Sequence, residues 1–153
     1  MKSISLYLCA VLCTLGLMTS CDYGVIPDAI SGTYKGTIDI DFNLSMVEDY
    51  DIEIPYEAVV TKVDEAYVEI ALDLNLTKYL NPTLVTLVGS SLDFGVVTAR
   101  CLVGPTMRGE TPLTGSATVG GKSVLVHGDF ENGVLDITYV LGVVTVEFEG
   151  IRQ

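Results

Sequence analysis

Alternating apolar and polar residues dominate the chain from residue 33 onward. The apolar positions recur at every second residue in 33–44, in 51–60 and again in 68–76. Since successive side chains of a β-strand point to opposite faces, this period of two is typical of a half-buried strand. Three such segments predict an antiparallel sheet with one face in the core and the other in solvent.

The period of two is lost in residues 77–91. Asn81 followed by Pro82 is typical of a helix start, and Gly89 is typical of a helix stop. A two-turn helix is therefore predicted here. A short strand is the alternative, because several of these residues are β-branched and two helical turns are marginal without packing.

A further strand is predicted over residues 92–103, and its inward face changes part-way. Phe94 and Val96 are predicted to face inward, and so are Ala99 and Cys101, which have the opposite parity. One extra residue in a strand swaps its faces, so we expect a β-bulge near Gly95, Val96 and Val97.

Two-residue turns are predicted at two places in the last third of the chain. Gly120-Gly121 and Asn132-Gly133 both accept the positive φ that tight hairpins need. The registers that these turns impose pair Ala117 with Val124, Phe130 with Leu135, Gly128 with Ile137 and Val126 with Tyr139.

The segment around Gly142 decides the number of strands. A reversal at Leu141-Gly142 gives eight strands and pairs Tyr139 with Val144, Ile137 with Val146 and Leu135 with Phe148. A bulge at Gly142 in one long strand would leave seven. We prefer eight, because an even number closes an up-and-down antiparallel barrel without free edges. The predicted fold is all-β, an eight-stranded antiparallel up-and-down barrel with one short helix.

An apolar leader precedes this domain. It runs for about 15 residues behind Lys2, short of the roughly 20 that cross a bilayer, and is typical of a cleaved signal peptide. Its end, Met18-Thr19-Ser20-Cys21, resembles the lipobox of bacterial lipoproteins, in which the Cys is lipidated and becomes the first residue. We expect a signal peptide over 1–20, a tether over 21–30 and a barrel over 31–151, held to a membrane through lipidated Cys21.

The charge and the cysteine content of the chain exclude several classes of function. With 8 Lys and Arg against 20 Asp and Glu, the chain offers no basic surface for nucleic acid. Of its four cysteines, Cys9 and Cys13 lie in the leader and Cys21 is expected to carry lipid. Cys101 is then the one thiol of the mature chain, which excludes an intramolecular disulfide or a cysteine metal site.

Two short motifs carry a family resemblance. The run ISGTYKGT over residues 30–37, directly after such a leader, resembles the opening of the calycin-like β-barrel lipoproteins of Gram-negative bacteria. The run VEFEG over 146–150 is similar to the last strand of that family. The resemblance implies a lipocalin-like barrel of eight strands anchored in the cell envelope, with the outer membrane expected and its periplasmic or surface face left open. It implies no enzymatic activity.

The acidic residues of the first strand do not match a calcium loop. Asp39, Asp41 and Asn43 have the spacing of an EF-hand start, but its sixth and twelfth positions are Leu44 and Tyr50 instead of Gly and Glu. With Asp51, Glu53 and Glu57 they are expected to form a solvated acidic wall.

His127 shares a strand face with Ser123 and Asp129. Four residues of strand span about 13 Å, far beyond the roughly 3 Å that a nucleophile and its base require. The register places His127 between Thr114 and Thr138 on the outer face. We therefore predict no catalytic residue, metal or cofactor, and no enzyme.

The inward positions are the candidate functional site. Those expected to line a ligand are Tyr34, Gly36, Tyr56, Gly128, Tyr139 and Phe148. Eight strands enclose an interior that side chains can fill or that can hold one small molecule, and glycines on the inner face would leave space. Two functions follow: a lipid-anchored barrel that binds a small apolar ligand, or a filled barrel that contacts a protein or glycan by its outer surface.

Overall fold

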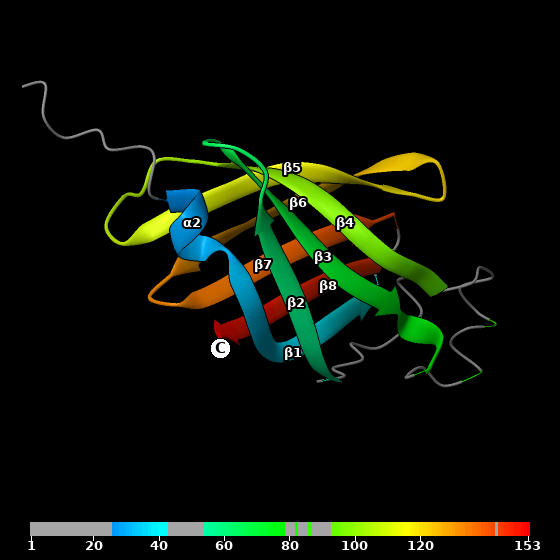
Figure 1. The fold of residues 1–153 in the computed structure, drawn as a ribbon. Helices are drawn as coiled ribbons and strands as arrows, with labels where there is room; N and C mark the ends of the chain where they lie inside the picture. Colours follow the sequence, from blue (N-terminus) through cyan, green and yellow to red (C-terminus); the bar gives the residue numbers. More distant parts are fainter. Residues whose placement is uncertain (1–25, 43–53, 79–81, 83–85, 87–92, 143) are drawn as a thin grey trace, which may run out of the picture.

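The computed structural model describes residues 26–42, 54–78, 82, 86, 93–142 and 144–153. Within them, eight antiparallel strands form a closed barrel in which each strand pairs with the next along the chain (Figure 1). The strands are β1 (Gly32–Phe42), β2 (Ile54–Lys62), β3 (Tyr67–Asn75), β4 (Asp93–Val103), β5 (Glu110–Val119), β6 (Lys122–Glu131), β7 (Val134–Leu141) and β8 (Val144–Arg152). The predicted fold class is confirmed.

A seam between the first and last strands closes the barrel. β1 pairs with β8 from Tyr34 opposite Arg152 to Phe42 opposite Val144. Because both edges of the sheet are used in this way, the described strands leave no open sheet edge.

The inner face follows the predicted alternation. Ile38 and Ile40 of β1, Ala58 of β2, and Ile70 and Leu72 of β3 are all buried. Their outward neighbours are mostly exposed. The apolar residues with period two therefore form one core inside the barrel.

The β-bulge predicted near Gly95, Val96 and Val97 is confirmed, and the extra residue lies between Asp93 and Val96. Asp73 pairs with Val96 and Asn75 with Asp93, so two steps along β3 face three along β4. Val97 is buried, whereas Val96, predicted to face inward, is 70% exposed. The prediction for Val96 was wrong because the extra residue lies before it, and the faces have already changed there.

The hairpin registers at Gly120-Gly121 and Asn132-Gly133 are confirmed pair by pair. The third reversal exists, but its register differs from the prediction by two residues. Leu141 pairs with Val144, so Tyr139 lies opposite Val146, Ile137 opposite Phe148, and Leu135 opposite Gly150. Gly142, with φ of 77°, takes the first position of the loop, where positive φ is needed. A shift of two keeps every side chain on its predicted face.

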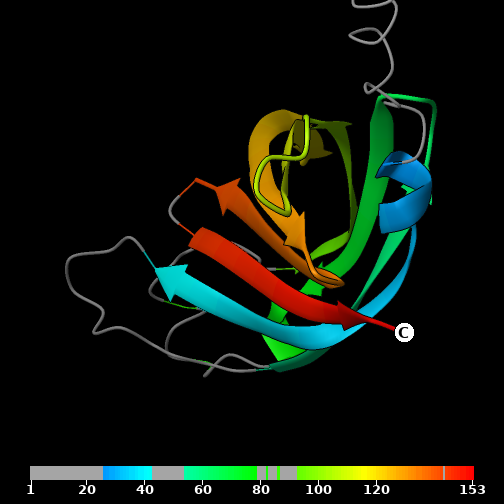
Figure 2. The same ribbon diagram turned by 90° about the vertical axis from the view of Figure 1, so that its left-hand side faces the viewer.

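The helix α2 (Ile26–Ile30) lies at the end of the barrel where β1 begins, within the segment expected as tether. Viewed from that side, it lies at the rim, and it contacts β2 (Figure 2). Ile30 is fully buried and belongs to the core. In the segment predicted as a helix, Pro82 and Thr86 are helical, a 3-10 turn η1 (Leu76–Lys78) precedes them, and most of the remainder lies outside the described residues.

Candidate functional site

Three aromatic residues predicted to line a ligand belong to the buried core. Tyr34, Tyr139 and Phe148 are 0% exposed, and Tyr56 is half-buried against the same cluster. The structure thus brings these four side chains to the inner face, as predicted.

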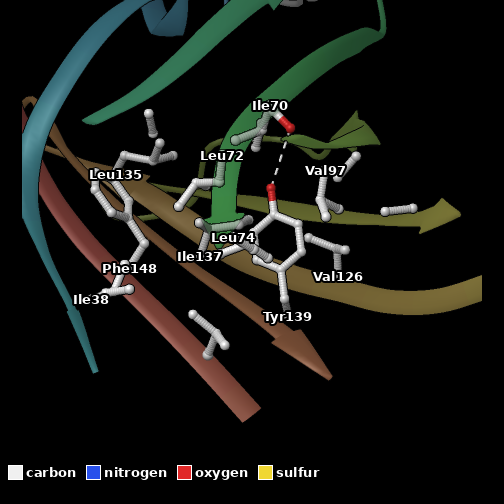
Figure 3. Packing of buried hydrophobic residues seen from close by; sticks show 14 of the residues in the cluster. Ile38, Ile70, Leu72, Leu74, Val97, Val126, Leu135, Ile137, Tyr139 and Phe148 are labelled. Carbon is white, nitrogen blue, oxygen red and sulfur yellow. Dashed lines mark hydrogen bonds between the residues drawn. The ribbon is translucent and has the colours of Figure 1, made fainter. Parts of the chain in front are cut away.

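Tyr139 spans the barrel interior. Its hydroxyl donates a hydrogen bond to the Ile70 carbonyl oxygen, 3.2 Å away on β3 (Figure 3). Burial strongly raises the pKa of this phenol, so the group is neutral and acts as a donor. Figure 3 shows apolar side chains around the ring, including Leu74, Val97 and Val126. A buried tyrosine with its one polar atom satisfied is packed as a core residue.

Tyr34 makes the equivalent contact at the α2 end. Its hydroxyl donates to the Ile30 carbonyl oxygen at 2.6 Å. Its ring lies edge-on to Phe130, with 6.3 Å between the centroids. Burial raises the pKa of this phenol, an effect partly opposed by the positive charge of Arg152. The side chain therefore fastens α2 to the barrel.

The two inner glycines do not leave space, which corrects the expectation from sequence. A Cβ on Gly36 would overlap the Glu149 carbonyl oxygen, and one on Gly128 would overlap the Asp136 carbonyl oxygen. The backbone of the neighbouring strand fills the volume that a side chain would take. Gly36 and Gly128 allow the neighbouring strands to approach closely, and they do not create a cavity.

Cys101 is fully buried on the inner face, at the position that the β-bulge gives it. Burial raises the pKa of its thiol to about 11. The group is a protonated, apolar core side chain at neutral pH.

A row of carboxylates crosses the outer wall of β6, β7 and β8. Asp136 of β7 lies directly opposite Asp129 of β6 on one side and Glu149 of β8 on the other. Partial burial raises the pKa of Asp136, and the negative charges of Asp129 and Glu149 raise it further, against a smaller opposite effect of His127. The turn at Asn132-Gly133 already implied the first of these pairings.

The acidic wall expected from β1 meets this row at Asp39, which lines an outer hollow of about 220 Å³ together with Asp136, Glu147 and Glu149. Asp39 lies opposite Glu147 of β8, but Glu57 lies opposite Lys35. Asn43, Asp51 and Glu53 fall outside the described residues. His127 is exposed between Thr114 and Thr138, as predicted.

Two larger hollows lie at the surface. One, of about 600 Å³, is on the outer wall of β3, β4 and β5, where the Arg100 guanidinium stacks 4.7 Å from the Tyr67 ring centroid. The other, of about 420 Å³, lies at the rim opposite α2. Its lining is mainly apolar and includes Phe94, Val119, Val124, Leu125, Val140 and Leu141.

Among the described residues, no three His, Cys, Asp or Glu side chains are placed so that they could hold a metal ion together. Within that same part of the chain, no helix has the length and apolarity needed to span a bilayer. Cys21 lies outside it, so its lipidation stays a prediction.

Sequence reasoning missed α2. The signal was present: Pro27 suits the first turn of a helix, Asp28 suits its N-terminal end, and Ile26 and Ile30 share one face. At five residues the helix is too short to show a period. It depends on contacts with the barrel that the sequence alone does not reveal.

Comparison with known proteins supports the fold. No protein-family model matches the sequence, and no curated protein is significantly similar to it. The structure resembles a crystal structure from Bacteroides fragilis NCTC 9343, described as a "putative outer membrane protein", with a TM-score of 0.60 and 17% identity. The match covers 84% of this chain and 53% of the other, so the chain spans about half the length of that protein. At this identity the similarity establishes a shared barrel fold.

Proposed function

We propose that this protein is a lipid-anchored barrel of the bacterial cell envelope, with a filled core and an outer surface that contacts another protein or a glycan. The observation that supports a filled core is the packing of Tyr34, Tyr139 and Phe148, which are fully buried. Both tyrosine hydroxyls are bonded within the barrel. The glycines that were expected to make room for a ligand are closed by neighbouring backbone.

The anchor is supported by the leader that ends at Cys21 and by the resemblance to envelope lipoproteins. The Bacteroides structure, described as a "putative outer membrane protein", agrees with an envelope location. Mass spectrometry of the membrane fraction tests it: the mature chain should begin at acylated Cys21. A Cys21→Ser protein that is processed and retained at the membrane like the wild type would contradict the anchor.

The filled core is tested by native mass spectrometry of protein purified from its own membrane. We expect the mass of the acylated chain with no small molecule, and no binding of small aromatic probes. Leu135→Ala is the positive control, because Leu135 is fully buried and its truncation opens an apolar cavity of the kind that takes up such probes. A guest that co-purifies with the wild type would overturn this interpretation.

A second function is supported by the apolar hollow at the rim opposite α2. Its volume of about 420 Å³ is within the range of small-molecule sites, and its lining suits an apolar ligand. Binding of a hydrophobic dye that is lost in Leu125→Glu, but kept in the matched outer-wall variant Leu102→Glu, would favour this site. Equal dye binding by both variants and the wild type would exclude it.

A further inference from the structure

The point at which the chain leaves the barrel is fixed by α2. Lys62 Nζ lies 2.8 Å from Asp28 Oδ2, and Arg152 Nη1 donates to the Ala29 carbonyl oxygen at 2.5 Å. Ile30 is buried in the core, and its carbonyl oxygen accepts from Tyr34. Residues 26–30 therefore belong to the rigid barrel, and only residues 22–25 separate it from Cys21.

This short connection limits how the barrel can stand on a membrane. The steps from Cys21 to Ile26 reach at most about 18 Å in any conformation. A strand as long as β1, tilted as in other barrels, gives a barrel height of about 27 Å. The rim opposite α2 is thus too far from the anchor point to be the end that meets the bilayer. Were α2 free, a reach of about 35 Å would permit either orientation.

Exposed apolar side chains concentrate in the same half of the barrel. Seven large apolar residues are exposed among the described ones. Five lie in loops or near strand ends on the α2 side, namely Val59, Val63, Leu102, Met107 and Ile151, whereas Val96 and Leu125 lie toward the opposite rim.

Met107 is the most prominent of the five. It is 70% exposed, and paired backbone hydrogen bonds with Glu110 hold it beside a tight turn. The next residue, Arg108, is also exposed and makes no salt bridge among the described residues. An apolar side chain next to a cation suits the bilayer interface, where one meets acyl chains and the other meets phosphate.

We propose that the α2 end of the barrel rests on the lipid bilayer that holds the anchor, with Met107 entering the headgroup region. This orientation rests on the proposed lipidation of Cys21. The opposite rim, with its apolar hollow, then points away from the membrane and is open to partners.

The experiment uses the absence of tryptophan from the chain, which makes any introduced tryptophan a single reporter. Met107→Trp and Val96→Trp are matched, since both residues are 70% exposed and they lie toward opposite ends. Each acylated full-length variant is placed in phosphatidylethanolamine and phosphatidylglycerol vesicles with brominated acyl chains. We expect bromine to quench the fluorescence of Met107→Trp at least twofold more than that of Val96→Trp. Equal quenching of the two variants, or stronger quenching of Val96→Trp, would overturn the orientation.

Two further measurements separate the ways in which this test can fail. Flotation of the vesicles and the mass of the mature chain report the anchor by themselves, so a chain that floats without differential quenching refutes the orientation alone. A chain that is not acylated refutes both proposals. Inserting ten Gly and Ser residues after Asp22 should reduce the difference between the reporters, because the longer tether frees the barrel. A difference that persists unchanged would show that the tether length does not set the orientation.

Discussion

The strands β7 and β8 carry well-packed side chains on one face and poorly matched charges on the other. Inside, Ile137, Tyr139 and Phe148 are fully buried. Outside, Asp136 is flanked by two further carboxylates in directly opposite positions. Like charges opposite one another destabilise a sheet, so the inner face must supply the free energy that the outer face loses. Stability and surface character are thus set separately, on alternate residues.

Truncating the inner face should have the largest effect. Phe148→Ala removes a ring that lies beside Leu135 and Ile38 (Figure 3), and we expect it to lower the free energy of unfolding by about 3 to 5 kcal/mol. Chemical denaturation monitored by circular dichroism measures this. The outer-wall control Leu125→Ala, at a position 61% exposed, should change stability by less than about 0.5 kcal/mol. Similar losses in both variants would contradict the contrast between the faces.

Adding a methyl group to the barrel wall should have the second-largest effect on stability. Gly128→Ala forces β6 away from β7, and a loss of about 1 to 3 kcal/mol is expected from the backbone shift. Gly120→Ala is the control, because a Cβ at Gly120 would meet no other atom. Its free energy of unfolding should fall by only about 1 kcal/mol, the cost of a side chain at the positive φ of 56°. If Gly128→Ala were as stable as the wild type, the interior would hold more room than the structure indicates.

Removing one buried hydroxyl should have a smaller effect. Tyr139→Phe deletes the donor to the Ile70 carbonyl oxygen and should cost about 1 kcal/mol. Tyr67→Phe, on the outer wall, keeps its ring against Arg100 and should be close to neutral. Thermal unfolding of the two variants side by side would reveal the difference, and equal melting temperatures would argue against the Tyr139 hydrogen bond.

The smallest expected effect is a gain on the outer face. Asp136→Asn removes the middle charge of three carboxylates and should stabilise the barrel by about 0.5 kcal/mol at pH 7. Glu57→Gln is the matched control, because Glu57 lies opposite Lys35 and its loss should give no gain. A stabilising effect of both variants would indicate a general response to net charge.

The pH dependence of that gain has a defined sign. The pKa of Asp136 is raised in the folded state, so folding favours its protonated form. The wild type should therefore recover stability relative to Asp136→Asn as the pH falls from the raised pKa toward the ordinary value of 3.8. The advantage of the variant should shrink over that window. An advantage that grows on acidification would contradict the raised pKa.

Much of the fold was predictable because strand alternation and tight turns depend on residues that are close together in the sequence. Period two defined which residues of β1, β2 and β3 face inward, and turn glycines defined two hairpin registers. The register at Gly142 was wrong by two residues because both registers place the same side chains inside, and the apolar pattern cannot distinguish them. Val96 was misplaced because a bulge leaves only a change of phase in the sequence, without its position.

The candidate site was predictable in its positions but not in its contents. Alternation placed Tyr34, Tyr139 and Phe148 inside. Whether they fill the interior depends on the distances between strands, which cannot be derived from the amino-acid composition. At Gly36 and Gly128 a missing side chain suggested space, yet the close approach of the neighbouring strand is the reason for the glycine.

The seam between β1 and β8 also determines when the domain can fold. Its pairs join residues 34–42 to residues 144–152, the longest sequence separation of any strand pairing in the barrel. Such distant pairings form slowly. None of them can form before β8 has left the ribosome, so one edge of β1 stays unpaired throughout synthesis. If the chain is exported as its leader predicts, this late closure would keep β1 and β8 apart while the chain passes through a translocation channel.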